Sequence, residues 1–407
     1  MFHGPGPLIV RRKHRRISLV AVVTHSAERI DRFPAPQPRF DRIAITCVFG
    51  DPRDGRSWSG APNNLATALE GLGIQVESIH PRLTRGARLE LALQDLLTGH
   101  GVATSGIDLL RSGRSREQLA AAVDDAALRL GVGHVLHTGA LDLPVRDRRH
   151  GIRHYLYCDH TWDLYRRHAV GRSAPSGKAA DAYERIEREA LHSVDHVFTF
   201  GAYVRDNLIR HYGVDPGRVT AVGSGMGQIE PYDGPKDYTR PRLLFVAKHY
   251  FREKGGRLVV DAFIEAHRRR PDLTLTIVGD ERSRRFVPPH PGISFHAHLP
   301  WRELQRLYHE ATLLTQPMLN DPWGQVFLEA LVSRTPVVGL HRNGLPEILD
   351  GGRHGFLVDE ARPKALADTI VEALSDPDRL ARMGTAGQAH VLDHYTWPRV
   401  ARAVAFS

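Results

Sequence analysis

Short apolar runs alternate with longer segments of helical periodicity from residue 42 onward. Residues 42–49 (RIAITCVF) have the composition of a buried strand, and residues 63–73, after a loop that contains Gly and Pro, have helical periodicity. Further apolar runs that predict strands lie at 74–79, 134–139, 153–159, 196–201 and 218–223. Because helical segments separate these runs, they predict a parallel sheet that is covered on both faces.

A linker is predicted between residues 226 and 241, where Gly, Pro and Asp interrupt the alternation. A second series then predicts strands at 242–248, 273–280, 292–298, 311–316 and 336–340, with helices at 255–269, from Trp301 and around Glu329. The chain is therefore expected to be an α/β protein with two Rossmann-like, doubly wound parallel-sheet domains, at residues 41–225 and 242–392.

The length and composition of the chain agree with this organisation. A chain of 407 residues is too long for one ordinary core, so two domains are expected. Its 42% hydrophobic and 25% charged residues are typical of a soluble globular protein. No apolar stretch approaches the ~20 residues of a transmembrane helix, which argues against an integral membrane protein.

The net charge of +9 is concentrated near the N-terminus, because residues 1–40 hold eight Lys or Arg against two acids. This segment ends in prolines and has no lasting periodicity, so it is expected to be a disordered basic extension. A signal peptide is disfavoured by the shortness of its apolar run, and a nucleic-acid partner would rest on this segment alone. Cys47 and Cys158 lack redox or metal-ligand spacing, which favours a reducing, cytoplasmic location.

Two lysines stand where a parallel sheet presents its ligand site, at the carboxyl end of a strand. Lys248 directly follows a predicted strand, and Lys254 precedes two glycines and a predicted helix. Lysine is scarce, with six in the whole chain. A helix N-terminus with two ammonium groups beside it would hold a diphosphate, whereas the alternative is a pair of solvated surface lysines.

Two carboxylates, Asp321 and Glu329, lie eight positions apart on either side of a glycine. Asp321 belongs to a predicted loop, and Glu329 to an amphipathic helix where it needs hydrogen-bond donors such as ribose hydroxyls. Gly324 allows close backbone approach, and the N–H groups of Gly324, Gln325 and Val326 are expected to point at the group that Asp321 holds. The alternative is an Asp that caps the helix and a Glu that is satisfied by a core Arg.

Asp159 and His160 lie at the end of another predicted strand, 153–159, in the first domain. Both stand at the carboxyl end of a strand, where a parallel sheet presents ligand-binding residues. A structural role is an equal alternative, and the sequence leaves open which of the two faces the ligand.

The segment 321–349 (DPWGQVFLEALVSRTPVVGLHRNGLPEIL) resembles the E-x7-E region of the retaining glycosyltransferase family 4, here in the form D-x7-E. The segment 245–256 (FVAKHYFREKGG) resembles the phosphate loop of that family, with Ala247 for Gly and Lys248 for Arg. Residues 351–359 and 395–404 are also similar to family segments. The resemblance is specific over the second half of the chain.

This resemblance implies the GT-B fold, in which a cleft separates two Rossmann-like domains, and a C-terminal helix, 393–407, that crosses back to the first domain. A nucleotide-sugar donor would lie mainly on the second domain. Glu329 would then hold the ribose, Asp321 the sugar hydroxyls, and Lys248 and Lys254 the leaving diphosphate, while Gly60 would let the first domain approach the phosphates.

The implied reaction is retaining hexosyl transfer to a glycan, a lipid-linked glycan or a small molecule, without a cofactor or an essential metal. Candidate metal ligands are sparse: Asp376 and Asp378 lie at a predicted helix start, and His296 and His298 alternate on one predicted strand.

Two alternative functions stay open. A GT-B sugar-nucleotide epimerase would share the fold, and a non-catalytic sugar-nucleotide-binding protein would suit the departures at Asp321 and Ala247. Arginines in the amphipathic segment 81–97 could bring the enzyme to the inner face of the cell membrane, although a solvated helix face is favoured.

Overall fold

The computed structural model describes residues 37–89, 110–144, 151–168 and 178–407. Of the basic extension predicted at 1–40, only the last four residues are described, and residues 90–97 of the amphipathic segment also lie outside the described residues. Residues Pro38–Ser407 form one compact unit, which is described by itself below.

The first sheet contains six parallel strands in the order β2-β1-β3-β4-β5-β6. It is built from residues that precede the linker. The strands are β1 (Arg42–Thr46), β2 (Gln75–Ile79), β3 (His134–Thr138), β4 (Arg153–Cys158), β5 (His196–Thr199) and β6 (Val219–Ala221).

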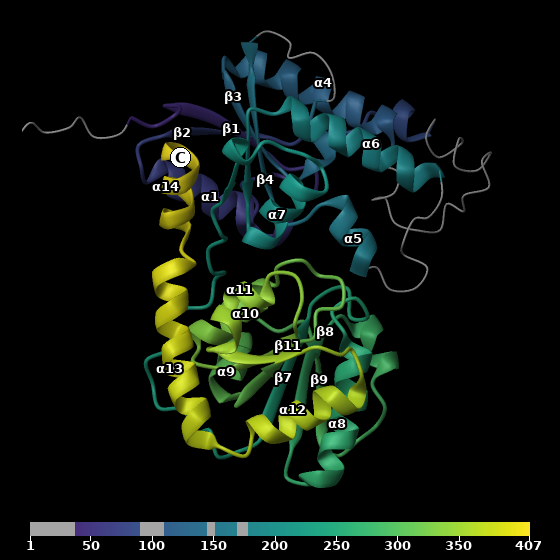
Figure 1. The fold of residues 1–407 in the computed structure, drawn as a ribbon, viewed down its shortest axis with the longest axis vertical. Helices are drawn as coiled ribbons and strands as arrows, with labels where there is room; N and C mark the ends of the chain where they lie inside the picture. Colours follow the sequence, from purple (N-terminus) through teal and green to yellow (C-terminus); the bar gives the residue numbers. More distant parts are fainter. Residues whose placement is uncertain (1–36, 90–109, 145–150, 169–177) are drawn as a thin grey trace, which may run out of the picture. The chain divides into compact units, whose positions relative to one another are not determined.

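The second sheet also contains six parallel strands, in the order β12-β11-β10-β7-β8-β9. Its strands are β7 (Arg242–Ala247), β8 (Thr274–Gly279), β9 (Ile293–Ala297), β10 (Leu313–Thr315), β11 (Val337–Leu340) and β12 (Gly355–Val358). Two parallel sheets with flanking helices confirm the predicted fold class (Figure 1).

Helices or short 3-10 turns lie between most successive strands of both sheets. Those of the first half are α1 (Ala61–Glu70), α4 (Gly113–Leu130), α5 (Trp162–His168), α6 (Lys178–Ser193) and α7 (Ala202–Arg210), with short 3-10 turns η1 (Ser57–Gly60), η2 (Ala140–Asp142) and η5 (Pro216–Arg218). Those of the second half are α8 (Gly256–Arg269), α9 (Trp301–Glu310), α10 (Gln325–Val332), α11 (Leu345–Ile348), α12 (Pro363–Ala373), α13 (Pro377–His394) and α14 (Trp397–Phe406), with η6 (Glu281–Phe286) and η7 (Asp350–Gly352).

Strand β7 shows why both faces of the second sheet are covered. Its side chains alternate between two hydrophobic clusters: Leu243 and Phe245 pack with residues of α8 and α12, whereas Leu244 and Val246 pack with residues of α10. A strand whose two faces both meet apolar helices is a continuous apolar run, which is the pattern that predicted it.

The last helix, α14, packs against α1 of the first half of the chain (Figure 1). Its buried residues, Val400, Ala401, Val404 and Ala405, recur at helical spacing and form one apolar face. The backbone N–H of Arg39 donates to the carbonyl of Ala405 at 2.8 Å, which ties this helix to the start of the described chain.

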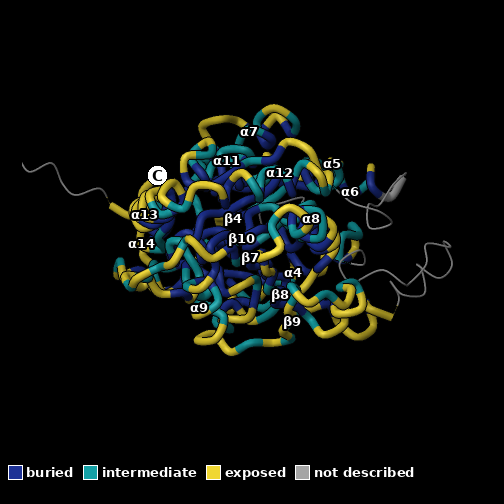
Figure 2. Tube along the Cα trace, turned by 90° about the horizontal axis from the view of Figure 1, so that it is seen from below, coloured by how far each residue is buried: buried dark blue, intermediate teal, exposed yellow. Residues whose placement is uncertain are grey.

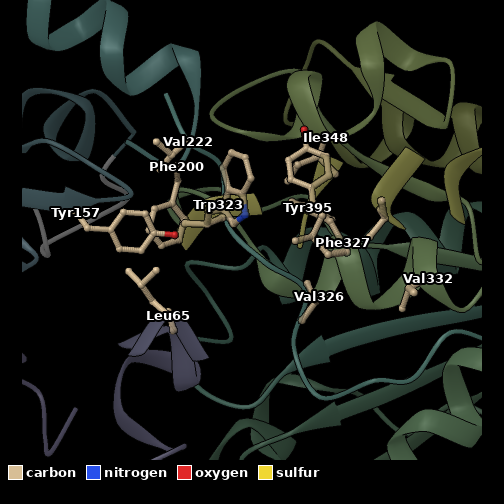
Figure 3. Close-up of a cluster of buried hydrophobic side chains, with 14 of the residues drawn as sticks. Leu65, Tyr157, Phe200, Val222, Trp323, Val326, Phe327, Val332, Ile348 and Tyr395 are labelled. Carbon is tan, nitrogen blue, oxygen red and sulfur yellow. The ribbon is translucent and has the colours of Figure 1, made fainter. Parts of the chain in front are cut away.

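One buried cluster joins the two halves. Figure 3 shows Leu65, Tyr157 and Phe200 of the first half near Trp323 and Tyr395 of the second. The ring of Trp323 meets that of Phe200 edge-on at 5.8 Å and lies 5.8 Å from that of Tyr395. In Figure 2 the buried positions gather inside the molecule and the exposed ones outside.

Two strand ends differ from the predicted ones. β1 stops at Thr46, three residues before the end of its apolar run, and β9 stops at Ala297. His298 has a φ of 50°, which no strand residue adopts, so the prediction that His296 and His298 share one strand was wrong.

Candidate active site

A cleft of about 830 Å³ lies at the carboxyl ends of the strands and is lined by residues of both sheet domains. Eight of the ten residues that the sequence singled out line it, namely Asp159, Lys248, Lys254, Asp321, Gly324, Gln325, Val326 and Glu329. The two others, Gly60 and His160, are not among its lining residues.

Lys254 and Asp321 form an ion pair inside the cleft. Lys254 Nζ lies 3.4 Å from Asp321 Oδ2, and the two side chains are 16% and 26% exposed. Backbone hydrogen bonds join their loops, since Met318 N donates to Lys254 O at 3.1 Å and Asn320 N donates to Glu253 O at 2.9 Å. The loop before α8 and the loop before α10 therefore form one connected structure that fixes both charges.

The N-terminal end of α10 is shaped by Gly324, which has φ 75° and ψ 80°. A Cβ atom there would lie 2.5 Å from Met318 Cε and 2.8 Å from the ring of Phe327, so only glycine fits. This turn separates Asp321 in the loop from Glu329 in the helix, as the sequence predicts.

Glu329 has a protein partner that the sequence analysis missed. Its Oε2 accepts a hydrogen bond from the hydroxyl of Tyr308 on α9 at 2.8 Å, and its side chain is buried. The protein partner of this carboxylate is therefore a tyrosine and not the core Arg of the alternative prediction. Burial raises the pKa of the Glu329 carboxyl, while the Tyr308 hydrogen bond and the charges of Lys254 and Lys248 oppose that rise.

The other oxygen of this carboxylate, Glu329 Oε1, lies next to the backbone of Gly227. A Cβ at Gly227 would come within 2.7 Å of Oε1. Both residues line the cleft, so the absence of a side chain at this position keeps that oxygen uncovered.

Gln325 fastens the start of α10 to the segment that follows β6. Its Nε2 lies 3.3 Å from Ser224 Oγ and 3.3 Å from Gly225 O, to which it donates. This side chain is therefore engaged by protein, and its backbone remains the part that can face a ligand.

Asp159 lies in the cleft, directly after β4. Burial raises the pKa of its carboxyl to about 7, and the nearby charge of Asp321 adds to that rise. Its backbone carbonyl accepts a hydrogen bond from the Tyr203 hydroxyl at 2.6 Å.

His160, in contrast, turns into the first domain. Its ring lies edge-on to that of Tyr165 at 6.4 Å, and neither buried ring nitrogen has a hydrogen-bond partner in the described part of the chain. Burial, together with the positive charges of His168 and Arg111, lowers the pKa of His160 to about 3.

The segment 55–61 supplies several of the first-domain residues that line the cleft. Trp58 and Ser59 have left-handed φ values of 42° and 57°, and Gly60 follows at 81° as the N-cap of α1. Such backbone strain at non-glycine residues concentrates at ligand sites. Gly60 thus supports the loop, while its neighbours Ser59 and Ala61 line the cleft.

Trp301 and Arg56 are among the lining residues that the sequence analysis missed. Trp301 begins α9, is 43% exposed, and its ring lies 5.9 Å from Lys248 Nζ. Arg56 brings a cation from the first domain and pairs with Asp54 at 2.8 Å. The sequence features that could have predicted them are the position of a Trp at the start of a helix and of an Arg in a loop between a strand and a helix.

No group of three or more His, Cys, Asp or Glu in a metal-binding arrangement occurs among the described residues. His296 is exposed on β9, and Asp376 caps α13 by accepting from Arg379 N at 2.8 Å. Within the same residues, no helix is long and apolar enough to cross a membrane.

Two family models match the chain in tandem. Residues 63–226 match the model described as Glycosyltransferase Family 4, and residues 240–376 match the one described as Glycosyl transferases group 1. The first match covers most of the first sheet domain and the second most of the second, and their boundary falls between residues 226 and 240.

Curated relatives agree with these matches. An alpha-maltose-1-phosphate synthase of Mycolicibacterium smegmatis is 29% identical over 53% of this chain and 63% of its own length. A D-inositol 3-phosphate glycosyltransferase of Streptomyces scabiei is 26% identical over 99% of this chain and 92% of its own length. Across four of the relatives, the chain spans 53% to 63% of their length.

Solved structures show the same fold. The sucrose-phosphate synthase of Thermosynechococcus elongatus has a TM-score of 0.69 at 16% identity, covering 89% of this chain and 96% of that one. The Anabaena protein Alr3699/HepE, in complex with UDP and glucose, has a TM-score of 0.59 at 13% identity, covering 89% and 98%. The tandem family matches and the curated relatives support a glycosyltransferase similar to family 4, and the solved structures show that its fold is GT-B.

Proposed function

We propose that the protein is a retaining, metal-independent hexosyltransferase that takes its sugar from a nucleotide-diphosphate sugar. The observation that carries this proposal is that one cleft holds both a buried carboxylate, Glu329 with Tyr308, and the Lys254–Asp321 ion pair. A donor of this class needs a hydroxyl-binding acid at its nucleoside, cations at its diphosphate and an acid at its sugar.

Glu329 would bind the ribose hydroxyls through Oε1, because Oε2 is already occupied by Tyr308. Tyr308, Leu304 and Trp301 lie three and four positions apart on α9, so they share one face of that helix. Leu304 and Trp301 line the cleft. This face would lead from the ribose to the base, and the exposed ring of Trp301 would stack on the base.

The diphosphate would lie between Lys248, Lys254 and the N-terminal end of α8. Gly255 is the N-cap of this 14-residue helix with a φ of 88°, and no side chain caps the free N–H groups. Arg56 would approach from the first domain. The combined positive charge suits a group whose negative charge grows as the sugar leaves.

Asp321 would hold a sugar hydroxyl, with Asp159 on the opposite, first-domain side of the cleft. In the proposed transfer, the bond from the sugar C1 to the phosphate oxygen breaks and a bond from C1 to an acceptor oxygen forms on the same face. The acceptor proton passes to the leaving phosphate oxygen, so no strong protein base is required.

The acceptor would bind the first domain and would be a glycan, a lipid-linked glycan or a small molecule. The relatives named for alpha-maltose-1-phosphate and D-inositol 3-phosphate favour the small molecule. We further propose a cytoplasmic location, with peripheral membrane contact only if the acceptor is lipid-linked.

A donor panel tests this function. UDP-, GDP-, ADP- and dTDP-sugars are compared by thermal shift, since a ligand that binds only the folded state raises its apparent stability. The selected donor is then incubated with phosphorylated and unphosphorylated polyols, sugars and lipid extracts, and NMR gives the anomeric configuration of the product. Retention without added metal supports the proposal, whereas an inverted product contradicts it.

The same assay separates the alternatives. A GT-B epimerase would yield free or epimerised sugar without any transfer product. A non-catalytic binding protein would show a thermal shift and no turnover with any acceptor.

A further inference from the structure

The two sheet domains also meet beside the cleft, where α7 of the first domain faces α11 of the second. The backbone N–H groups of Ala202 and Tyr203 donate to the carboxylate of Glu347 at 2.8 Å and 2.7 Å. These N–H groups belong to the first turn of α7, where no residue of that helix can accept from them. An acid of the second domain therefore caps a helix of the first domain.

The hydroxyl of Tyr203 reaches the cleft residues from the same turn. It lies 2.6 Å from the carbonyl of Asp159 and 2.8 Å from the carbonyl of Pro322, so one O–H donor is shared between both domains. Pro322 directly follows Asp321. Each of these peptide carbonyls thus adjoins a carboxylate that faces the cleft.

The residues around this contact are tightly packed. A Cβ at Gly201 would lie 2.9 Å from Glu347 Oε2 and 2.9 Å from the ring of Trp323. The Tyr395 hydroxyl donates to the carbonyl of Glu347 at 3.2 Å, which holds α11 from its other side. Side chains larger than hydrogen at residue 201 would force α7 away from α11.

Tyr203 remains a proton donor throughout the physiological pH range. Burial raises the pKa of its hydroxyl, and the negative charges of Asp159 and Glu347 raise it further. The hydroxyl therefore keeps the proton that it shares between the two carbonyls.

We propose that Tyr203, oriented by Glu347, is a positioning residue that sets the separation of Asp159 and Asp321 when the domains close on the donor. This inference rests on the proposed function, because it assigns Asp159 and Asp321 to the two sides of the bound sugar. Tyr203 itself is not among the residues that line the cleft. Its effect is carried by two backbone carbonyls.

Replacement of Tyr203 by Phe tests the inference with the loss of one oxygen atom. We expect kcat to fall at least tenfold, whereas the Kd of the donor nucleotide changes less than threefold, because Glu329, Lys248 and Lys254 are untouched. The matched control is Tyr238→Phe, which also loses a hydroxyl bound to a carbonyl, at 2.6 Å from Arg334 O, but within the second domain. Tyr238→Phe is expected to leave kcat within twofold.

Amide hydrogen exchange supplies a readout that does not need turnover. In the Glu347→Gln protein, exchange at the amides of residues 202 and 203 is expected to be at least fivefold faster than in Tyr238→Phe, since the cap on these N–H groups is weakened directly. In the Tyr203→Phe protein the cap keeps its bonds, and exchange at the same amides should rise because α7 loses the hydroxyl contact with both domains. Unchanged exchange in both variants would overturn the inference. So would kcat of Tyr203→Phe equal to that of the control.

These outcomes remain separate from those of the proposed function. Suppose that the wild-type protein transfers no sugar but the exchange rates change as expected. The contact of Tyr203 and Glu347 then still joins the two domains, and the positioning role in catalysis is wrong together with the proposed function. If transfer occurs and Tyr203→Phe alters donor Kd more than kcat, Tyr203 acts in binding and the positioning role is wrong.

Discussion

Lys254 Nζ lies 3.4 Å from Asp321 Oδ2, so the cation proposed for the diphosphate and the acid proposed for the sugar are held together before any ligand binds. Both side chains are mostly buried, which reduces screening of the pair by solvent. Such a pair fixes the long Lys254 side chain and the Asp321 carboxylate at the place where a phosphate and a sugar would join. Its two members should nevertheless differ in the step that they affect.

Replacement of Lys254 by Ala should lower kcat more than it raises KM. Negative charge on the departing diphosphate is greatest in the transition state, so a cation beside it stabilises that state above the bound donor. We expect a fall in kcat of roughly 10²-fold, the size seen when one such electrostatic contact is removed. Steady-state kinetics with the identified donor measures both constants.

The control for that variant is Lys364→Ala. It removes an ammonium group that pairs with Asp368 at 2.6 Å on the exposed surface. It should leave both constants unchanged. A Lys254→Ala enzyme in which only KM rises would contradict the assigned role.

Asp321→Asn should reduce kcat/KM at least tenfold, because a charged hydrogen bond to a sugar hydroxyl contributes ~1.5–3 kcal/mol. Asp321→Glu should bring no gain. The loop is fixed by Asn343 Nδ2, which donates to Asp321 O at 3.2 Å, and by Gly344 N, which donates to Pro322 O at 3.1 Å. A longer acid would therefore overshoot the present position of the carboxylate.

Both variants are compared with Asp368→Asn, an exposed acid outside the cleft. Activity of Asp321→Asn near that of the wild type would show that this acid only stabilises the turn and the Lys254 side chain.

Glu329→Gln should weaken donor binding at least tenfold while the protein stays folded, because the amide loses the charge that strengthens its bond to a ribose hydroxyl. Tyr308→Phe should weaken it less but should destabilise the protein by about 1–3 kcal/mol, since a buried carboxylate oxygen then loses its donor. Calorimetric titration with the nucleotide and chemical denaturation measure the two effects. Equal affinity of Glu329→Gln and wild type would remove Glu329 from the site.

Several of these residues could be predicted from the sequence and others could not. Lys248 and Asp159 follow apolar runs, and the ends of parallel strands converge at one edge, so their position was accessible. The contact between Tyr308 and Glu329 was not, because it joins two helices whose adjacency depends on the order of the strands. The position of Trp58 in the cleft could not be predicted either, because it depends on a left-handed backbone that a tryptophan seldom adopts.

The choice between Asp159 and His160 shows the same limit at the scale of one residue. Successive side chains of a strand point to opposite faces, so the answer depends on where β4 ends, and that end is Cys158. The apolar run alone fixed this position only to within a residue or two.

Activity should persist in excess chelator. The proposed cations at the diphosphate are Lys248, Lys254 and Arg56, which would supply the charge that a divalent ion supplies elsewhere. Initial rates are measured after dialysis against EDTA, with and without added Mg²⁺ or Mn²⁺. Loss of activity that either ion restores would refute metal independence.

Asp159 should make the stability of the ligand-free protein depend on pH. Its folded pKa, raised to about 7 by burial and by Asp321, exceeds the value of about 3.9 in an unfolded chain. The folded state therefore binds this proton more tightly, so the contribution of Asp159 to stability is complete below pH ~4 and is lost as the pH rises through ~7.

Asp159→Asn, which stays neutral at every pH, should be more stable than wild type at pH 8 by a few degrees in Tm, and this difference in Tm should narrow towards pH 5. Melting curves at intervals of half a pH unit test this, with Asp125→Asn, which replaces an exposed acid on α4, as the matched variant. A gap between Asp159→Asn and wild type that is constant from pH 5 to pH 8 would mean that Asp159 is already ionised across that range, and its carboxylate would then act as a second charged ligand for the sugar beside Asp321.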